Sequence, residues 1–123
     1  MVGKSILRDK SFAFAIRIVN LSLHLQKTKK EYVLNKQILR SGTAIGALIR
    51  EAEFGQSRAD FINKMTVSLK EANETEYWLM LLKETKFLEE KLATSLIFDC
   101  SELIKMLVSS IKTAKDKLAK SEK

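Results

Sequence analysis

The sequence has 123 residues, the length of one ordinary domain, and its 46% apolar and 30% charged residues, with no proline, are typical of a helix-rich protein with a real core. A formal net charge of +7 fits either a well-solvated surface or a polyanionic partner such as nucleic acid. The single cysteine, Cys100, excludes an internal disulfide, and no stretch reaches the roughly 18 consecutive apolar residues of a membrane span, so we expect one cytoplasmic domain over residues 1–123 with no membrane partner.

The first predicted helix begins at Ser5 or Ser11, ends at Lys27 and carries two apolar stripes. One stripe holds Phe12, Ile16, Val19 and Leu23. The second, nearly opposite, holds Phe14, Ile18, Leu21 and Leu25. A helix packed only inside its own bundle needs one stripe, so we assign the second to an interface between copies of the chain. The alternative is a scatter of exposed apolar residues, which is normal on protein surfaces.

The second predicted helix runs from Tyr32 to Phe54, is capped by Gly55, and contains Gly42 and Gly46. Glycine inside a helix costs about 1 kcal/mol relative to alanine. Because the two glycines are four residues apart, they lie on one side of the helix, where the missing side chains leave room for a neighbouring helix. The alternative is a local kink or a backbone contact with a ligand.

The third predicted helix starts at Ser57 and reaches about Lys86. Its predicted core face holds Phe61, Met65, Leu69, Ala72 and Leu79. Trp78 and Leu81 lie well off this face, so we assign them to the same interface between copies.

Glu76 falls within that apolar face on a helical wheel. A buried carboxylate needs a partner or takes up a proton. We therefore expect Glu76 to pair with Arg50 or with the Ser41 hydroxyl on the preceding helix, while Glu71 lies at the margin of the face. A buried pair that fixes the helix register is favoured over a catalytic carboxylate.

The fourth predicted helix runs from Glu89 to Leu118, and we expect the basic end, residues 113–123, to fray. Its single apolar stripe holds Leu92, Leu96, Cys100, Leu103, Leu107, Ile111, Ala114 and Leu118. Cys100 is thus predicted to be a small core residue rather than a catalytic thiol. Short connections between long helices predict an all-α, antiparallel, up-down-up-down four-helix bundle.

In such a bundle the start of the first helix and the end of the fourth lie at the same end. The basic residues expected there are Lys4, Arg8, Lys10, Arg58, Lys112, Lys115, Lys117 and Lys120. Lysines contact phosphates as point charges, so this end is predicted to bind an RNA or DNA backbone without sequence preference. The alternative is a solvated lysine-rich end that only keeps the protein in solution.

Motifs for catalysis, cofactor binding and metal binding are missing from the sequence. It has no GxxxxGK[ST] or GxGxxG stretch, and its one histidine, His24, does not form the Glu-x-x-His pair of di-metal bundles. We therefore predict that the protein is not an enzyme and holds no cofactor or metal.

Two stretches resemble a known family: SGTAIGALIREA, residues 41–52, and LKEANETEYWL, residues 69–79, with DFINK between them. They are similar to the four-helix proteins encoded in intervening sequences of bacterial 23S ribosomal RNA genes. That family's pattern is close to S-G-T-S-I-G-A-N-I-R-E-A followed by L-K-E-A-x-E-T-E-Y-W-L. The motif residues carried by this chain include Ser41, Gly42, Gly46, Arg50, Glu71 and Glu76.

The resemblance implies a left-handed bundle that assembles as a ring, a pentamer in known relatives. It also implies kinship with accessory proteins of diversity-generating retroelements, which are implicated in binding a reverse transcriptase and nucleic acid. Two classes of function follow: a nucleic-acid-binding accessory or scaffold oligomer, or a structural oligomer that binds only protein.

Overall fold

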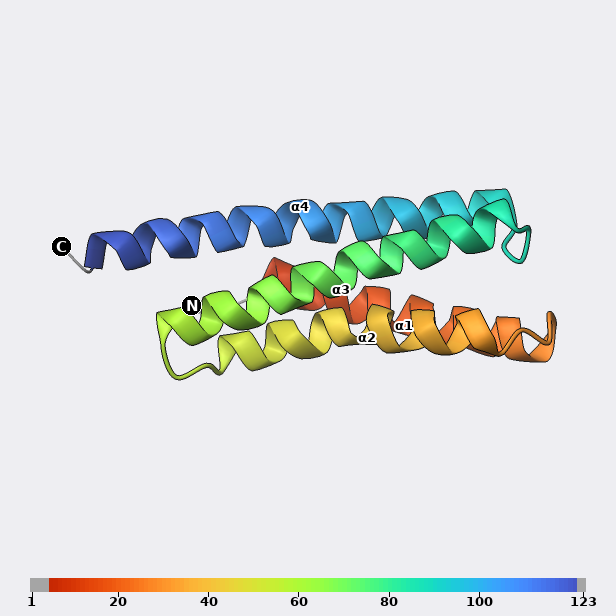
Figure 1. Ribbon diagram of the computed structural model, residues 1–123, viewed down its shortest axis with the longest axis horizontal. Coiled ribbons are helices and arrows are strands. Elements are labelled where there is room, and N and C mark those ends of the chain that lie inside the picture. Colours follow the sequence, from red (N-terminus) through yellow and green to blue (C-terminus); the bar gives the residue numbers. More distant parts are fainter. Residues whose placement is uncertain (1–4, 122–123) are drawn as a thin grey trace.

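The computed structural model describes residues 5–121, and these residues form four α-helices. The helices are α1 (Ile6–Lys27), α2 (Val33–Glu53), α3 (Arg58–Glu84) and α4 (Glu90–Ser121). Successive helices run in opposite directions, so the chain goes back and forth along one long axis (Figure 1). The all-α, four-helix architecture predicted from the sequence is confirmed.

Helix starts are fixed by local capping. The Ser5 side chain accepts a hydrogen bond from the Arg8 N–H at 3.0 Å, and the Ser57 side chain accepts one from the Asp60 N–H at 3.0 Å. Each bond satisfies one of the N–H groups that a helix start leaves without a partner. The predicted helix boundaries agree with the observed ones to within about three residues. The expected fraying at residues 113–123 is not seen up to Ser121, where α4 ends.

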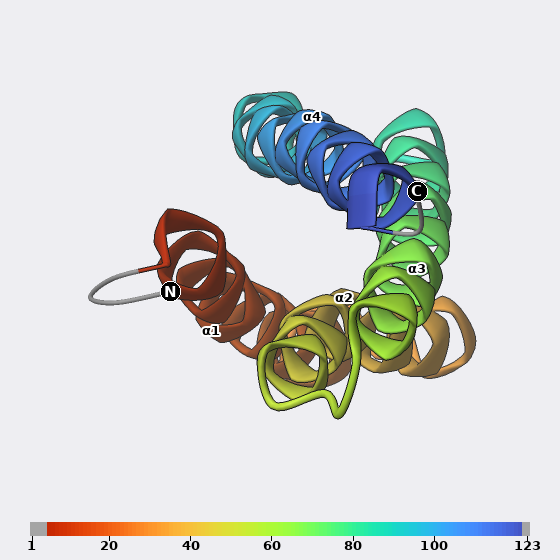
Figure 2. The same ribbon diagram turned by 90° about the vertical axis from the view of Figure 1, so that its left-hand side faces the viewer.

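Viewed along the bundle, the helices follow one another around an arc in the order α1, α2, α3, α4 (Figure 2). Each helix packs extensively on its neighbour in sequence, and the contact between α1 and α4 is the smallest of the four contacts between helices. Ion pairs bridge these two helices: Arg17 Nη1 lies 2.6 Å from Asp99 Oδ2, and Lys10 Nζ lies 3.4 Å from Glu102 Oε1.

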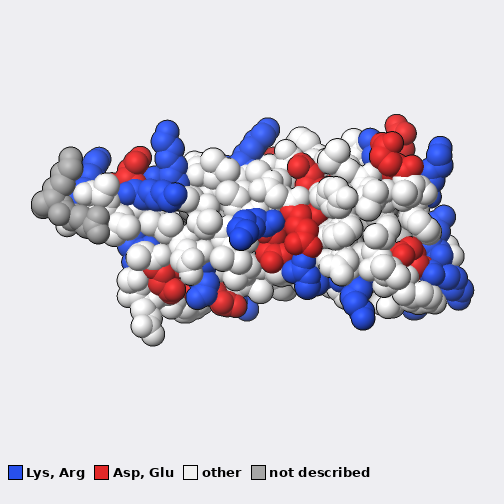
Figure 3. All heavy atoms as spheres, viewed as in Figure 1, with Lys and Arg blue, Asp and Glu red and all other residues white. Residues whose placement is uncertain are grey.

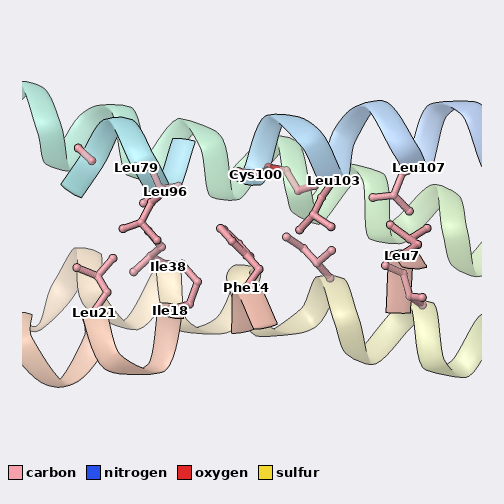
Figure 4. Packing of buried hydrophobic residues seen from close by; sticks show 14 of the residues in the cluster. Leu7, Phe14, Ile18, Leu21, Ile38, Leu79, Leu96, Cys100, Leu103 and Leu107 are labelled. Carbon is pink, nitrogen blue, oxygen red and sulfur yellow. Dashed lines mark hydrogen bonds between the residues drawn. The ribbon is translucent and has the colours of Figure 1, made fainter. Parts of the chain in front are cut away.

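The core contradicts the interface assignment made for α1. The stripe of Phe14, Ile18, Leu21 and Leu25 is buried within one chain, where Phe14, Ile18 and Leu21 point towards residues of α3 and α4 (Figure 4). The opposite stripe is the exposed one: Phe12 is 66% exposed and Ile16 is 49% exposed. The assignment of the second stripe to an interface was therefore wrong, because the bundle uses it as its own core.

The stripe on α4 is confirmed for most of its length. Leu96, Cys100, Leu103, Leu107 and Ile111 are buried, while Leu92 at its start is partly exposed. Figure 4 shows several of these side chains facing the core residues of α1.

The two glycines of α2 face α1. A β-carbon at Gly42 would lie 2.8 Å from Ile18 Cγ1, and one at Gly46 would lie 3.3 Å from the Ser11 carbonyl oxygen. The close approach of a neighbouring helix, predicted from their spacing, is present, and that neighbour is α1.

Candidate protein and nucleic-acid interfaces

An apolar stripe lies on the outer side of α1. Phe12, Ile16, Val19 and Leu23 recur at helical spacing, and all four are between 41% and 66% exposed. Isolated exposed apolar residues are common, but four large ones in one line are typical of a surface that another protein covers. Sequence periodicity found this stripe, although we had taken it for the core-facing one.

Trp78 and Leu81 are half-buried on α3. The Trp78 indole N–H donates a hydrogen bond to Glu74 Oε2 at 2.9 Å, and Trp78 packs against the core. Arg40 on α2 binds both Glu74 and Glu71, the latter at 3.0 Å. The hydrogen bond from Trp78 and the ion pair with Arg40 together lower the pKa of Glu74 below its ordinary value. This polar cluster joins α2 to α3 at the surface, and a role of Trp78 and Leu81 in assembly stays a prediction.

The expected burial of Glu76 was wrong. Glu76 is half-buried, and no hydrogen bond or ion pair joins it to Arg50 or Ser41 within residues 5–121. Arg50 is exposed on α2. The core face of α3 is rotated from the predicted one, so that Thr75 rather than Glu76 points inwards.

Thr75 takes the place that we gave to Glu76. Its hydroxyl lies 2.9 Å from Ser41 Oγ and 2.8 Å from the Glu71 carbonyl oxygen, and both Ser41 and Thr75 are fully buried. A second buried hydroxyl, that of Ser68, donates to the Ile45 carbonyl at 2.9 Å. Ser41 therefore belongs to a small set of buried polar contacts between α2 and α3, and these contacts fix the register of the two helices.

Cys100 is fully buried, as predicted, and its thiol donates to the Ala72 carbonyl at 3.3 Å. Burial raises the pKa of the thiol to about 12, with smaller contributions from the charges of Glu76 and Asp99. The thiolate, which is the reactive form, is thus disfavoured at neutral pH.

The predicted basic end is only partly assembled. Lys112, Lys115, Lys117 and Lys120 are exposed on α4, whose C-terminal part projects beyond the other three helices (Figure 1). Asp116 is the single acid among them. Arg58 is exposed at the start of α3, and Lys4 lies outside the described residues.

Arg8 and Lys10, which we assigned to the basic end, lie beside acidic residues. Arg8 Nη1 is 3.4 Å from Glu53 Oε1, and Lys10 is paired with Glu102 at 3.4 Å. Their charges are largely compensated, so the basic surface at this end is concentrated on α4 rather than spread over the whole end of the bundle.

Lysines also gather at the opposite end, which sequence reasoning overlooked (Figure 3). The segment formed by the end of α1 and the turn to α2 carries Lys27, Lys29 and Lys30. Its one acid, Glu31, accepts hydrogen bonds from the backbone N–H groups of Val33 and Asn35 and so caps α2. The sequence KTKK indicates this cluster of lysines. The backbone conformation of the turn could not be inferred from local composition.

A groove of about 890 Å³ lies between the start of α1 and the second half of α4. Its apolar lining includes Leu7, Phe54, Phe61 and Met106, and its polar rim includes Arg8 and Lys105. The loose packing of α1 against α4 leaves this lining open to solvent.

Two further properties concern residues 5–121. None of their helices is long and apolar enough to cross a membrane. No group of three or more histidine, cysteine, aspartate or glutamate side chains in this part of the chain is arranged to hold a metal ion.

Residues 4–109 match the sequence model of a family described as 23S rRNA-intervening sequence protein. The fold also matches a crystal structure, at 1.70 Å resolution, of a protein of unknown function from the S23 ribosomal protein family of Bacteroides thetaiotaomicron. The two sequences are 57% identical, the match covers 87% of this chain and 99% of the other, and the TM-score is 0.86. Among curated proteins, none is significantly similar to the chain.

Proposed function

The chain belongs to the 23S rRNA-intervening sequence protein family, and from that premise we propose that it is a non-enzymatic, cytoplasmic homo-oligomer whose projecting α4 end contacts the phosphate backbone of nucleic acid. The observation that carries the assembly is the exposed stripe of Phe12, Ile16, Val19 and Leu23. Water is excluded from such a stripe when another protein surface covers it, which favours association. The resemblance that the sequence shows to ring-forming relatives supports a closed ring, with a pentamer as the expected size.

The nucleic-acid part of the proposal rests on the four exposed lysines of α4. A ring with cyclic symmetry repeats this end once per subunit on a single face, so a weak contact made by one copy becomes multivalent. Each lysine that neutralises a phosphate releases a counterion, so binding weakens steeply with salt. These lysines have no aromatic residue among them to stack on a base, so little sequence preference is expected.

The competing function is a structural oligomer without nucleic-acid binding. Titration of labelled RNA and duplex DNA at about 50 mM and 200 mM salt distinguishes the two, since the proposal requires affinity that falls by orders of magnitude over that range. Charge reversal at Lys112, Lys115 and Lys117 should weaken binding by about tenfold or more. Reversal of Lys70, an exposed lysine on α3, is the control and should leave most of it. Absence of binding by the wild-type protein at about 50 mM salt favours the structural oligomer.

Assembly is tested separately by light scattering. The wild-type mass should exceed that of one chain, and Phe12→Glu with Ile16→Glu should lower it while the helical content stays the same. Asn20→Glu adds one such carboxylate at an exposed site on α1 outside the stripe and should leave the mass unchanged. A monomeric wild-type protein at micromolar concentration contradicts the proposal.

A further inference from the structure

The backbone of Lys30 adopts a left-handed conformation with φ of 55° in the turn between α1 and α2. A side chain at such a position is strained, and glycine is the residue that usually occupies it after a helix. The chain thus carries a lysine where a glycine would make the turn more stable. A position that gives up stability for a particular side chain is a candidate functional position.

The surroundings of Lys30 supply a chemical reason for a positive charge. Lys27 and Lys29 lie in the same short segment and are exposed, and none of the three lysines forms an ion pair with another residue of segment 5–121. The carboxylate of Glu31 is held by backbone N–H groups at the start of α2, at 2.8 and 3.2 Å. The turn therefore presents uncompensated positive charge.

An aromatic side chain accompanies the charge. Tyr32 directly follows Glu31 and is 56% exposed. Proteins that bind single-stranded nucleic acid combine basic side chains, which contact phosphates, with exposed aromatic rings, which stack on unpaired bases.

We propose that the α1–α2 turn is a second nucleic-acid contact, selective for single strands, with Lys29 and Lys30 on the phosphate backbone and Tyr32 stacked on a base. This site is at the opposite end of the bundle from the α4 lysines (Figures 1 and 3). It stands whether or not the α4 end binds nucleic acid, and the experiment separates the two.

The chain contains a matched control for the test. Lys86, in the turn between α3 and α4, is also left-handed, with φ of 63°. Its turn is flanked by Glu84, Glu89 and Glu90, which balance the local charge. Lys30→Gly and Lys86→Gly therefore remove the same charge and the same backbone strain from two turns that differ in net charge.

Both glycine variants should raise the midpoint of thermal unfolding by about 3 °C, because each relieves a left-handed lysine. Binding of a labelled single-stranded oligonucleotide should weaken roughly fivefold in Lys30→Gly and stay within about 1.5-fold of wild type in Lys86→Gly. Combining Lys29→Gln with Lys30→Gly should reduce the salt slope by about 1.4, the value for two phosphate contacts on a single strand.

Tyr32→Ala should weaken single-strand binding roughly tenfold and leave duplex binding unchanged, as loss of one stacked base predicts. The same measurements are made on the variant whose charges at Lys112, Lys115 and Lys117 are reversed. Its loss of binding gives the contribution of the α4 end alone. Equal effects of Lys30→Gly and Lys86→Gly, or no effect of either on binding, overturn the proposal. The proposal is also overturned if the turn variants lose binding to phosphatidylserine vesicles but keep oligonucleotide binding. That result identifies an anionic membrane as the ligand.

Discussion

Ile18 of α1 packs directly on the bare backbone of Gly42 in α2. A β-carbon at Gly42 would lie 2.8 Å from Ile18 Cγ1 and 2.9 Å from Ile18 Cγ2, closer than real β-carbons approach other atoms. Ile18 is branched at its own β-carbon and fully buried, so it has little freedom to move away. The contact between α1 and α2 therefore depends on the absence of a side chain at position 42.

Gly42→Ala should destabilise the protein by up to about 2 kcal/mol in urea unfolding. Alanine gains about 1 kcal/mol of helix propensity, but forcing a methyl group into a packed core costs about 1–3 kcal/mol. In the Ile18→Ala background the clash is gone, so the same substitution should become neutral or stabilising. An unchanged effect of Gly42→Ala in that background contradicts the contact.

Gly46→Ala is the matched comparison, because its β-carbon would lie 3.3 Å from Ser11 atoms, a distance that needs a shift of only a few tenths of an ångström. The gain in helix propensity and the cost of that shift are of similar size, so we expect the stability to stay within about 1 kcal/mol of wild type.

The two stripes of α1 should respond in opposite ways to an added carboxylate. Ile18→Asp places a charge in the fully buried stripe and should unfold the protein, because a buried unpaired charge costs several kcal/mol. Ile16→Asp, two residues away on the exposed stripe, should keep the circular dichroism of the wild type and alter only the mass in solution. Retained folding in Ile18→Asp would place the core on the other side of α1.

Cys100 should not react with iodoacetamide in the native protein at pH 8, because burial keeps the pKa of its thiol near 12. Denaturant should expose it to rapid alkylation. The Cys100→Ser variant is the control that measures alkylation at residues other than Cys100. Rapid labelling of the folded protein would mean that the α3–α4 interface opens readily.

The raised pKa of Cys100 also predicts a dependence of stability on pH. The folded state holds the thiol proton more tightly than the unfolded state, whose pKa is near 9, so the contribution is complete below pH 9 and is lost as the pH rises towards 12. The difference in unfolding free energy between wild type and Cys100→Ala should stay constant up to pH 9 and shrink by about 1.4 kcal/mol at pH 10. The alanine variant corrects for lysines and tyrosines that titrate in the same range.

Glu74 should report its protonation through Trp78, the single tryptophan of the chain. The hydrogen bond from the indole and the pairing with Arg40 lower the pKa of Glu74, so the fluorescence midpoint in an acid titration should fall below the ordinary glutamate value of 4.5. The stability from this pairing is present above that value and is lost as the pH falls through the lowered pKa. Arg40→Gln should move the midpoint up, and Glu74→Gln should remove it.

Several features of the fold could be predicted from the sequence because they depend on neighbours along the chain. The four helices follow from periodicity, the start of α3 from Ser57, and the buried face of α4 from one apolar stripe, while the sequence left the start of α1 open between Ser5 and Ser11. Capping bonds span three residues, and a single stripe leaves one way to bury a helix. Cys100 was placed correctly for the same reason.

Other features were decided by the tertiary structure, because the local sequence favours two alternatives equally or indicates none. Two stripes of similar apolarity on α1 leave the rotation of the helix undetermined, and the contact of Ile18 with Gly42 selects one of them. A small rotation of α3 puts Thr75 in the core in place of Glu76. The charges of Arg8 and Lys10 are compensated by Glu53 and Glu102, which lie 45 and 92 residues away in the sequence. No local sequence pattern reveals these pairs. The left-handed backbone of Lys30 likewise arises where two packed helices must be joined by a short turn, because packing of the helices outweighs the local preference of a lysine.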